Sequence, residues 1–278
     1  MHSPQSNSDI NYKKHPIFKD LDVYETFYED LIFTISSVGL AGVGPHISIN
    51  SDILANLKGT IYSFRLLLES KLLNDGNALL RKFHEVSNFH VYLLLYISHE
   101  TKKNLENGTL ELFVDKVKKW IDDTAQFDSF ANQLSYIKTS HELSDAYAIL
   151  DYDNRYASIK KRANEHIHLN SWHNSFLNNN TMYYEGRENI LDIFRIDLLD
   201  VIICHTMLLF VLQPFYMCSE NYLEFAEMNQ PLPAELKNKA MPFIDIFFIK
   251  VVLPHRKDIY AFVEKETGIL FESPLHGI

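Results

Sequence analysis

Long stretches without glycine or proline limit the folds open to this chain more than any other feature. The 278 residues include nine glycines and nine prolines, which gather at a few points. Between these points apolar residues recur three and four positions apart, as on one face of an α-helix, and no alternation of period two persists. We therefore predict an all-α helical bundle, with helices over residues 20–38, 51–73, 76–104, 110–123, 128–150, 155–169, 187–217, 222–228, 242–252 and 256–266.

The glycines and prolines also predict where the chain is divided. Residues 39–45 (Gly-Leu-Ala-Gly-Val-Gly-Pro) indicate an interruption, and Gly76 and Gly108 indicate turns that end helices. The first residues are polar and lack the apolar stretch of a signal peptide. The weakest later point is the pair Pro231 and Pro233. The predicted organisation is a flexible N-terminal leader, a helical bundle domain and a C-terminal helical extension packed on the bundle, over residues 1–19, 20–220 and 221–278.

Charge and cysteine content exclude several classes of function. The net charge of −10 disfavours non-specific coating of nucleic acid, although a local cationic cleft for one RNA loop needs only a few positive groups. Cys204 and Cys218 are too few for a disulfide framework or a four-thiolate zinc site, which favours a reducing, cytoplasmic setting. The apolar run 201–212 contains His205 and is shorter than the ~20 residues that a membrane helix needs.

A first polar constellation lies on the helix predicted over 76–104. Arg81 and Glu85 are four positions apart and share one helix face, and Arg65 and Glu69 repeat this arrangement on the preceding helix. One interpretation is a salt bridge at the edge of the core. The other is that Glu85 or Asn88 lies behind an active site and orients another group, within an internal polar network whose members must all be satisfied.

A second constellation, residues 160–170, is dense in side chains that form hydrogen bonds. On an ideal helix Arg162 and His166 share one face, and Asn164 and His168 share a neighbouring one. If the helix ends near residue 169, Arg162 and His168 can converge. Trp172 and His173 follow this segment.

An arginine and a histidine together suit metal-independent RNA cleavage. Histidine moves protons near neutral pH, and arginine stays charged and binds phosphate with two parallel hydrogen bonds. One group can activate the 2′-hydroxyl while the other stabilises the charged phosphorus centre. The alternative is a solvated helix end with two ordinary histidines, His166 and His168.

Other chemistry finds less support in the sequence. His166, His168 and His173, or His84 with His90, could be metal ligands, but their spacings match neither HExxH nor a cysteine-containing zinc site. Glycine-rich phosphate loops and the GxSxG nucleophile elbow are absent. We therefore expect no metal and no cofactor.

Residues 162–168 (Arg-Ala-Asn-Glu-His-Ile-His) fit the R-x4-6-H signature of the HEPN superfamily. The surrounding block also resembles a group of bacterial helical proteins that carry R-x-N-[DE]-x-x-H-x-N followed by an asparagine-rich turn. Similar later blocks are residues 216–222 and 231–233. The matching positions of the motif block are Arg162, Asn164, Glu165, His168 and Asn170, with the turn at residues 178–180.

The resemblance implies a helical bundle, a homodimer and, in active members, a metal-independent endoribonuclease of a bacterial defence or toxin system. There the motif arginine and histidine of two protomers line one cleft. Only Arg162 and His168 carry over, and Ala163 stands where active members often have a polar residue. Expected partners are RNA, with tRNA as one candidate, and an antitoxin or regulator. The alternatives are a non-catalytic helical binding or dimerisation module, and a small-molecule or metal site.

These considerations give each site residue an expected role. His168 transfers a proton, Arg162 holds the scissile phosphate, Asn164 orients His168, and Glu85 positions Arg162. The remaining supporting residues are Arg81, His166 and Asn170.

Overall fold

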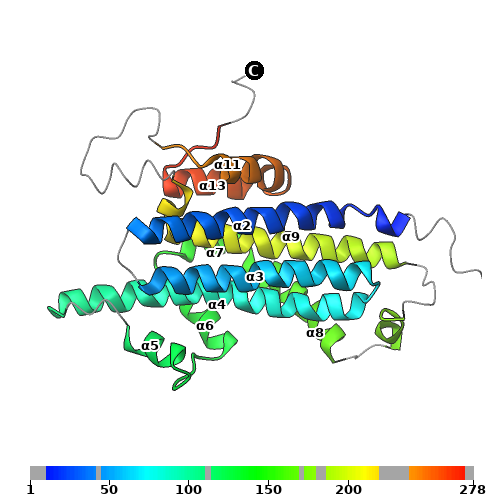
Figure 1. Cartoon of the computed structure of the whole chain (residues 1–278), viewed down its shortest axis with the longest axis horizontal. Helices are drawn as coiled ribbons and strands as arrows, with labels where there is room; N and C mark the ends of the chain where they lie inside the picture. Colours follow the sequence, from blue (N-terminus) through cyan, green and yellow to red (C-terminus); the bar gives the residue numbers. More distant parts are fainter. Residues whose placement is uncertain are drawn as a thin grey trace, which may run out of the picture.

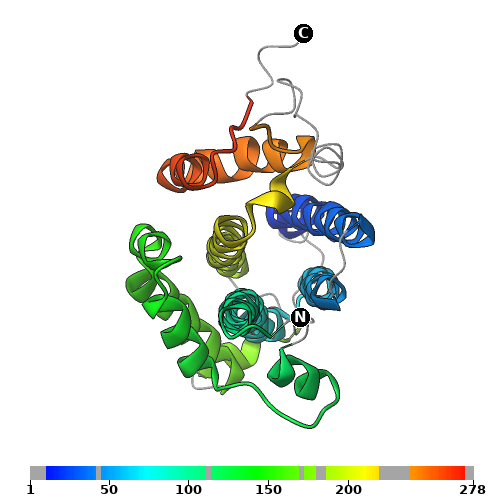
Figure 2. The same ribbon diagram turned by 90° about the vertical axis from the view of Figure 1, so that its left-hand side faces the viewer.

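Four long helices form the centre of the molecule. The computed structural model describes residues 11–41, 45–109, 114–168, 172–179, 186–218 and 238–272. The central helices are α2 (Ile17–Ala41), α3 (Pro45–Glu69), α4 (Leu73–Glu106) and α9 (Arg187–Leu212), which run side by side (Figure 1). Seen close to end-on they enclose a common centre (Figure 2), where Tyr28, Phe64, Phe83 and Phe194 are fully buried.

Shorter helices cover this bundle on two sides. On one side α8 (Tyr152–Ile167) and α6 (Phe130–Thr139) pack on α4, while α7 (Ser144–Leu150) contacts α9. The short helix α5 (Asp115–Ile121) lies beside the C-terminal half of α4 (Figure 1). On the other side α2 and α9 are covered by the C-terminal elements, which are α11 (Pro242–Phe247), the π-helical turn η4 (Phe248–Val252), α12 (Leu253–His255) and α13 (Lys257–Thr267).

The apolar second half of α9 follows from its central position. Its residues from Val201 to Phe210 are all buried, since α4 lies on one side and α13 on another. A helix that is apolar all round is buried within a protein or a membrane. Among the described residues, no helix is long and apolar enough to cross a membrane.

The all-α prediction is confirmed for the described residues, and the predicted breaks are corrected in detail. The interruption at 39–45 is shorter, because α2 continues to Ala41 and Pro45 begins α3, where proline's missing N–H costs nothing. Gly108 follows the end of α4 with φ +74°, as predicted. The predicted helix 128–150 is two helices separated by residues 140–143. The predicted helix 222–228 and the pair Pro231 and Pro233 lie outside the described residues.

The turn predicted at Gly76 is wrong. Gly76 lies in the first turn of α4, and the chain reverses earlier, at Lys71, whose φ is +63°. A Cβ atom at Gly76 would lie 3.1 Å from Cδ2 of Leu68, so the glycine permits a close approach between α4 and the end of α3.

The flexible leader expected over 1–19 is not found in its described part, residues 11–19. Tyr12 is buried, and its hydroxyl donates to the carbonyl of Leu68 at 2.6 Å. His15 is also buried, and Ile17 at the start of α2 has no exposed surface. These apolar contacts anchor a segment whose polar composition alone suggested disorder.

Candidate functional site

The structure separates Arg162 from His168. Helix α8 ends at Ile167, and the backbone N–H of His168 still donates to the carbonyl of Asn164 at 3.1 Å, so residue 168 continues the helical path. Six positions on such a path place two side chains about 120° apart around the axis. The expected convergence of Arg162 and His168 within one chain is therefore not found.

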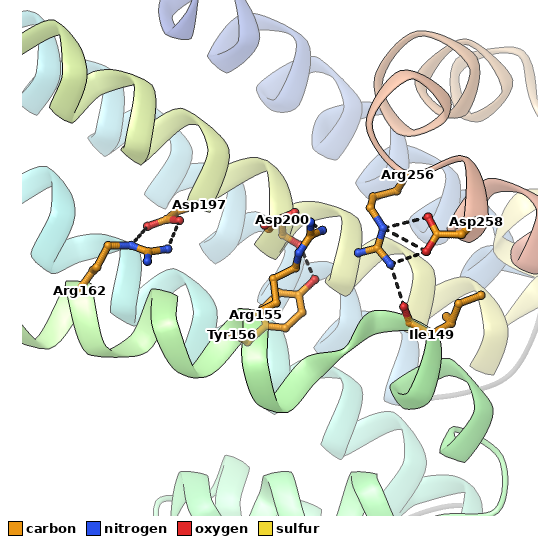
Figure 3. A network of polar contacts seen from close by, with 8 residues as sticks. All are labelled: Ile149, Arg155, Tyr156, Arg162, Asp197, Asp200, Arg256 and Asp258. Carbon is orange, nitrogen blue, oxygen red and sulfur yellow. Dashed lines mark hydrogen bonds and ion pairs between the residues drawn. The ribbon is translucent and has the colours of Figure 1, made fainter.

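Arg162 faces α9, where it meets a buried carboxylate (Figure 3). Its Nε and Nη2 donate to the two carboxylate oxygens of Asp197 at 2.8 and 2.5 Å. The Asp197 side chain is 5% exposed and that of Arg162 is 42% exposed. The hydrogen bonds to Asp197 raise the pKa of Arg162, so its guanidinium stays charged. This two-bond pair fixes α8 on α9.

A second arginine–aspartate contact between α8 and α9 lies two turns earlier on α8. Nη1 of Arg155 contacts Oδ1 of Asp200 at 3.1 Å, and the hydroxyl of Tyr156 donates to the carbonyl of Asp200 at 3.0 Å. Burial raises the pKa of the Asp200 carboxyl. Asp197 and Asp200 were not among the predicted site residues, although Arg155 and Arg162 recur seven positions apart on α8, a spacing that aligns them along one helix face.

Arg256 adds a third polar contact at this end of the interface. Its Nη2 donates to the carbonyl of Ile149 in α7 at 2.8 Å and to the carboxylate of Asp258 at 2.7 Å (Figure 3). The C-terminal elements are thereby tied to the same layer of helices that carries Arg162.

The face of α8 around Asn164 is turned toward α4. Oδ1 of Asn164 accepts a hydrogen bond from Nη1 of Arg81 at 2.7 Å, and Nε of Arg81 donates to Glu85 at 2.8 Å. The predicted Arg81–Glu85 pair is confirmed. Glu85 contacts Arg81 and not Arg162, whose carboxylate partner is Asp197, so the positioning role expected for Glu85 is wrong.

Exposed polar side chains occupy the outer part of this face. Lys161, Glu165 and His168 are exposed, and Asn164 is half-buried. The side-chain ammonium of Lys160 lies 4.9 Å from the ring centre of Phe130, a cation–π contact at the edge of the face. We call Lys161, Asn164, Glu165 and His168 the polar face of α8.

His166 is held by Asn74 at the start of α4. Its Nδ1 lies 3.1 Å from Oδ1 of Asn74, and Nδ2 of Asn74 donates to the carbonyl of His166 at 3.2 Å. Because an amide oxygen only accepts, Nδ1 carries the proton. Burial lowers the pKa of His166. This residue therefore anchors the last turn of α8 instead of facing solvent.

Two asparagines that follow the motif, Asn174 and Asn178, form hydrogen bonds at the ends of two helices. Oδ1 of Asn178 accepts from the backbone N–H groups of Asn74 and Asp75 at 3.0 and 3.3 Å, at the N-terminus of α4. Nδ2 of Asn174, in the 3₁₀ helix η1 (Trp172–Phe176), donates to the carbonyl of Glu165 at 3.1 Å. These bonds fasten the end of α8 beside the start of α4. Asn170 lies outside the described residues.

The described residues do not assemble a metal site. No group of three His, Cys, Asp or Glu side chains among them is close enough to hold an ion. His84 instead contacts the hydroxyl of Tyr152, and His90 contacts His205. The side chain of His173 is not among those described. Burial raises the pKa of the Cys204 thiol to about 12, which makes it an inert core group.

The chain is characterised by its helical fold and by the way that helix α8 is held in it. It is an all-helical protein in which arginine–carboxylate pairs fix a two-sided helix, α8, whose outer face is polar and carries an exposed histidine. Comparison with protein-family models, with characterised proteins and with solved structures finds no match to this chain.

Proposed function

We propose that this chain is a metal-independent endoribonuclease of the HEPN type, and that the polar face of α8 meets the RNA. The observation that carries the proposal is the exposed His168, one turn beyond an asparagine whose amide is held by Arg81. An exposed imidazole beside a fixed amide and cationic groups matches the needs of phosphodiester cleavage.

The proposed reaction needs only the chain, the RNA and water. His168 accepts the proton of a 2′-hydroxyl, whose oxygen forms a bond to the adjacent phosphorus. The bond from phosphorus to the 5′-oxygen breaks, and that oxygen takes up a proton from water. His168 then gives its proton to the hydroxide left behind, which restores the neutral base. The products are a 2′,3′-cyclic phosphate and a 5′-hydroxyl end.

Arg81 is better placed than Arg162 to face the phosphate within one chain. The guanidinium of Arg162 is committed to Asp197, on the side of α8 that meets α9. Arg81 contacts Asn164 on the polar face, and its side chain is 30% exposed. We therefore assign phosphate binding to Arg81 and a positioning role to Arg162.

This assignment predicts a stability defect for Arg162. Arg162→Met leaves the buried Asp197 carboxylate unpaired, and we expect the free energy of unfolding to fall by about 2 kcal/mol. The double variant Arg162→Met/Asp197→Leu removes both charges and should recover at least about half of that loss. Urea unfolding followed by circular dichroism measures both values. An Arg162→Met protein as stable as the wild type would contradict the positioning role.

The resemblance supports the biological setting of the proposal. The proposed setting is a bacterial defence or toxin system, with tRNA as one candidate substrate and an antitoxin or regulator as partner. The direct test is incubation of the purified wild-type chain with total RNA and with tRNA, in excess EDTA. Cleavage that leaves 5′-hydroxyl and cyclic phosphate ends supports the proposal, whereas cleavage only without chelator contradicts it.

We further predict a homodimer. Ile193 and Ile196 are 46% and 59% exposed on α9, beside Asp197, and Ile167 at the end of α8 is 42% exposed. A second copy packed here would shield these side chains and bring the two α8 helices together. Such an interface should bury at least about 1,000 Å² in total. Light scattering at micromolar concentration should give twice the chain mass of 32.4 kDa, and a strict monomer would contradict the prediction.

A non-catalytic helical binding module is the second candidate, and one observation favours it. The arginines around α8 are each paired with a carboxylate, as Arg81 with Glu85, Arg155 with Asp200 and Arg162 with Asp197. Such pairing lowers the net positive charge available to RNA. An intact dimer that cleaves none of the RNAs tested would favour this candidate.

A further inference from the structure

Trp172 stands out from the surface on the 3₁₀ helix η1, which follows α8 in the chain. Its side chain is 80% exposed, the largest value among the large apolar residues of the described chain. Its ring packs edge-to-face on Phe176, with the ring centres 5.2 Å apart and an interplanar angle of 86°. A large flat side chain so exposed contributes little stabilising burial, and its faces are open to a ligand.

The short helix that carries Trp172 is anchored at its middle and just after its end. Asn174 donates to the carbonyl of Glu165 in the last turns of α8. Leu177 is buried, and its carbonyl accepts from the backbone N–H of Leu73 at 3.1 Å. The indole is therefore presented by a fixed backbone, at the same end of α8 that carries His168.

The helix that carries Trp172 is hydrogen-bonded to the last turns of α8, whose outer face is polar. The nearby face of α8 offers Lys161, Asn164, Glu165 and His168, and Arg81 contacts that face from α4. Protein-binding hot spots instead lie within surfaces whose neighbouring contacts exclude water. An exposed flat ring on a helix joined to a face that carries a lysine, an amide and an imidazole suits a ligand with exposed aromatic bases and a phosphate backbone.

We propose that Trp172 is a stacking platform for an unpaired base, and that the ligand of this end of α8 is single-stranded nucleic acid. The proposal rests on the proposed function, since it names the form of RNA which the same face accepts. Every base has a π-face, so the platform tolerates many sequences, whereas a duplex hides its bases from the ring. Stacking of one base on Trp172 holds the strand, while the phosphate backbone of the strand crosses the polar face of α8.

The chain has two tryptophans, which allows a matched experiment. Trp120 is partly buried on α5 against Phe89 and Phe127, away from α8. The probe is a 2′-O-methyl oligoadenylate of about ten nucleotides, which binds as a single strand and has no free 2′-hydroxyl to react. Its binding to the full-length wild type and to each variant is measured by anisotropy of a labelled strand and by quenching of tryptophan fluorescence.

We expect the quenching to follow Trp172. The Trp120→Phe protein should bind like the wild type and be quenched, whereas Trp172→Phe should retain part of the affinity with little quenching. Trp172→Ala should lose about tenfold or more in affinity. In cleavage assays Trp172→Ala should raise KM with little change in kcat, because the ring holds the strand and does not touch the reacting atoms. A duplex of the same sequence should compete poorly.

The outcomes separate this inference from the proposed function. Equal affinity of the wild type and Trp172→Ala overturns the platform and leaves the nuclease proposal standing. Binding that depends on Trp172, in a protein that cleaves no RNA, supports the platform and overturns the nuclease. A wild type that does not bind the strand overturns the platform, and the exposed ring is then better explained by a protein partner.

Discussion

Acidification from pH 7 to pH 5 is expected to remove most of the stability of this protein. Three fully buried histidines, His84, His90 and His205, lie in its core. Burial lowers the pKa of His84 to about 4 and that of His90 to about 3, and it lowers the pKa of His205 well below the ordinary value. All three are therefore neutral in the folded protein at pH 5.

The hydrogen bonds explain why these histidines resist protonation. Nδ1 of His90 lies 3.0 Å from Nε2 of His205, whose Nδ1 lies 2.7 Å from the hydroxyl of Tyr28. Two facing ring nitrogens share one proton, so a second proton would set two N–H groups against each other. Nε2 of His90 is buried without a hydrogen-bond partner within the described part of the chain, so a charge on that ring would find no compensation.

The direction of the pH effect follows from proton uptake. In the unfolded chain histidine takes up a proton near pH 6.5, whereas in the folded protein these three take one up only at lower pH. Stability is therefore fully present above about pH 6.5 and is lost as the pH falls below it. Each histidine contributes about 2 kcal/mol of this loss at pH 5, and three together approach the whole stability of a typical domain.

Urea unfolding at pH 7 and at pH 5, followed by circular dichroism, measures this loss. His84→Gln is the matched variant. The hydroxyl of Tyr152 donates to Asn88 at 3.1 Å, so Nε2 of His84 donates to Tyr152, and the glutamine amide can supply that donor. We expect the variant to show about 2 kcal/mol less difference between the two pH values. Equal unfolding free energies of the wild type at both pH values would contradict the account of the core.

The sequence predicted the helices well because apolar periodicity is a local signal. It misplaced the turn at Gly76, since a glycine needed for a close approach to Leu68 looks the same as a glycine that ends a helix. The polar start of the chain suggested disorder, but Tyr12 and Ile17 are buried. Each of these errors comes from contacts that a local pattern does not contain.

The site was predictable only where its partners are close in sequence. Arg81 and Glu85 are four positions apart, and their pairing was predicted from that spacing. Asp197 lies 35 positions from Arg162, and His205 lies 115 positions from His90. Which side of α8 meets α9 depends on the packing of the whole bundle, so the sequence could name Arg162 and His168 without showing that they face different ways.

His168→Ala is expected to abolish most RNA cleavage while leaving the fold intact. Loss of a proton-transfer group lowers the rate by about 10²-fold or more. His168 is exposed at the end of α8, so its removal should change stability little. His141 is also exposed, on a turn before α7, and His141→Ala is the matched control for loss of a surface histidine.

The most direct test compares the cleavage rates of the wild type, His168→Ala and His141→Ala on the same RNA, in excess EDTA. The account predicts equal rates for the wild type and His141→Ala and a rate at least about 10²-fold lower for His168→Ala, with the helical circular dichroism spectrum unchanged in all three. Equal cleavage by His168→Ala and the wild type would contradict the assignment of His168 as the proton-transfer group.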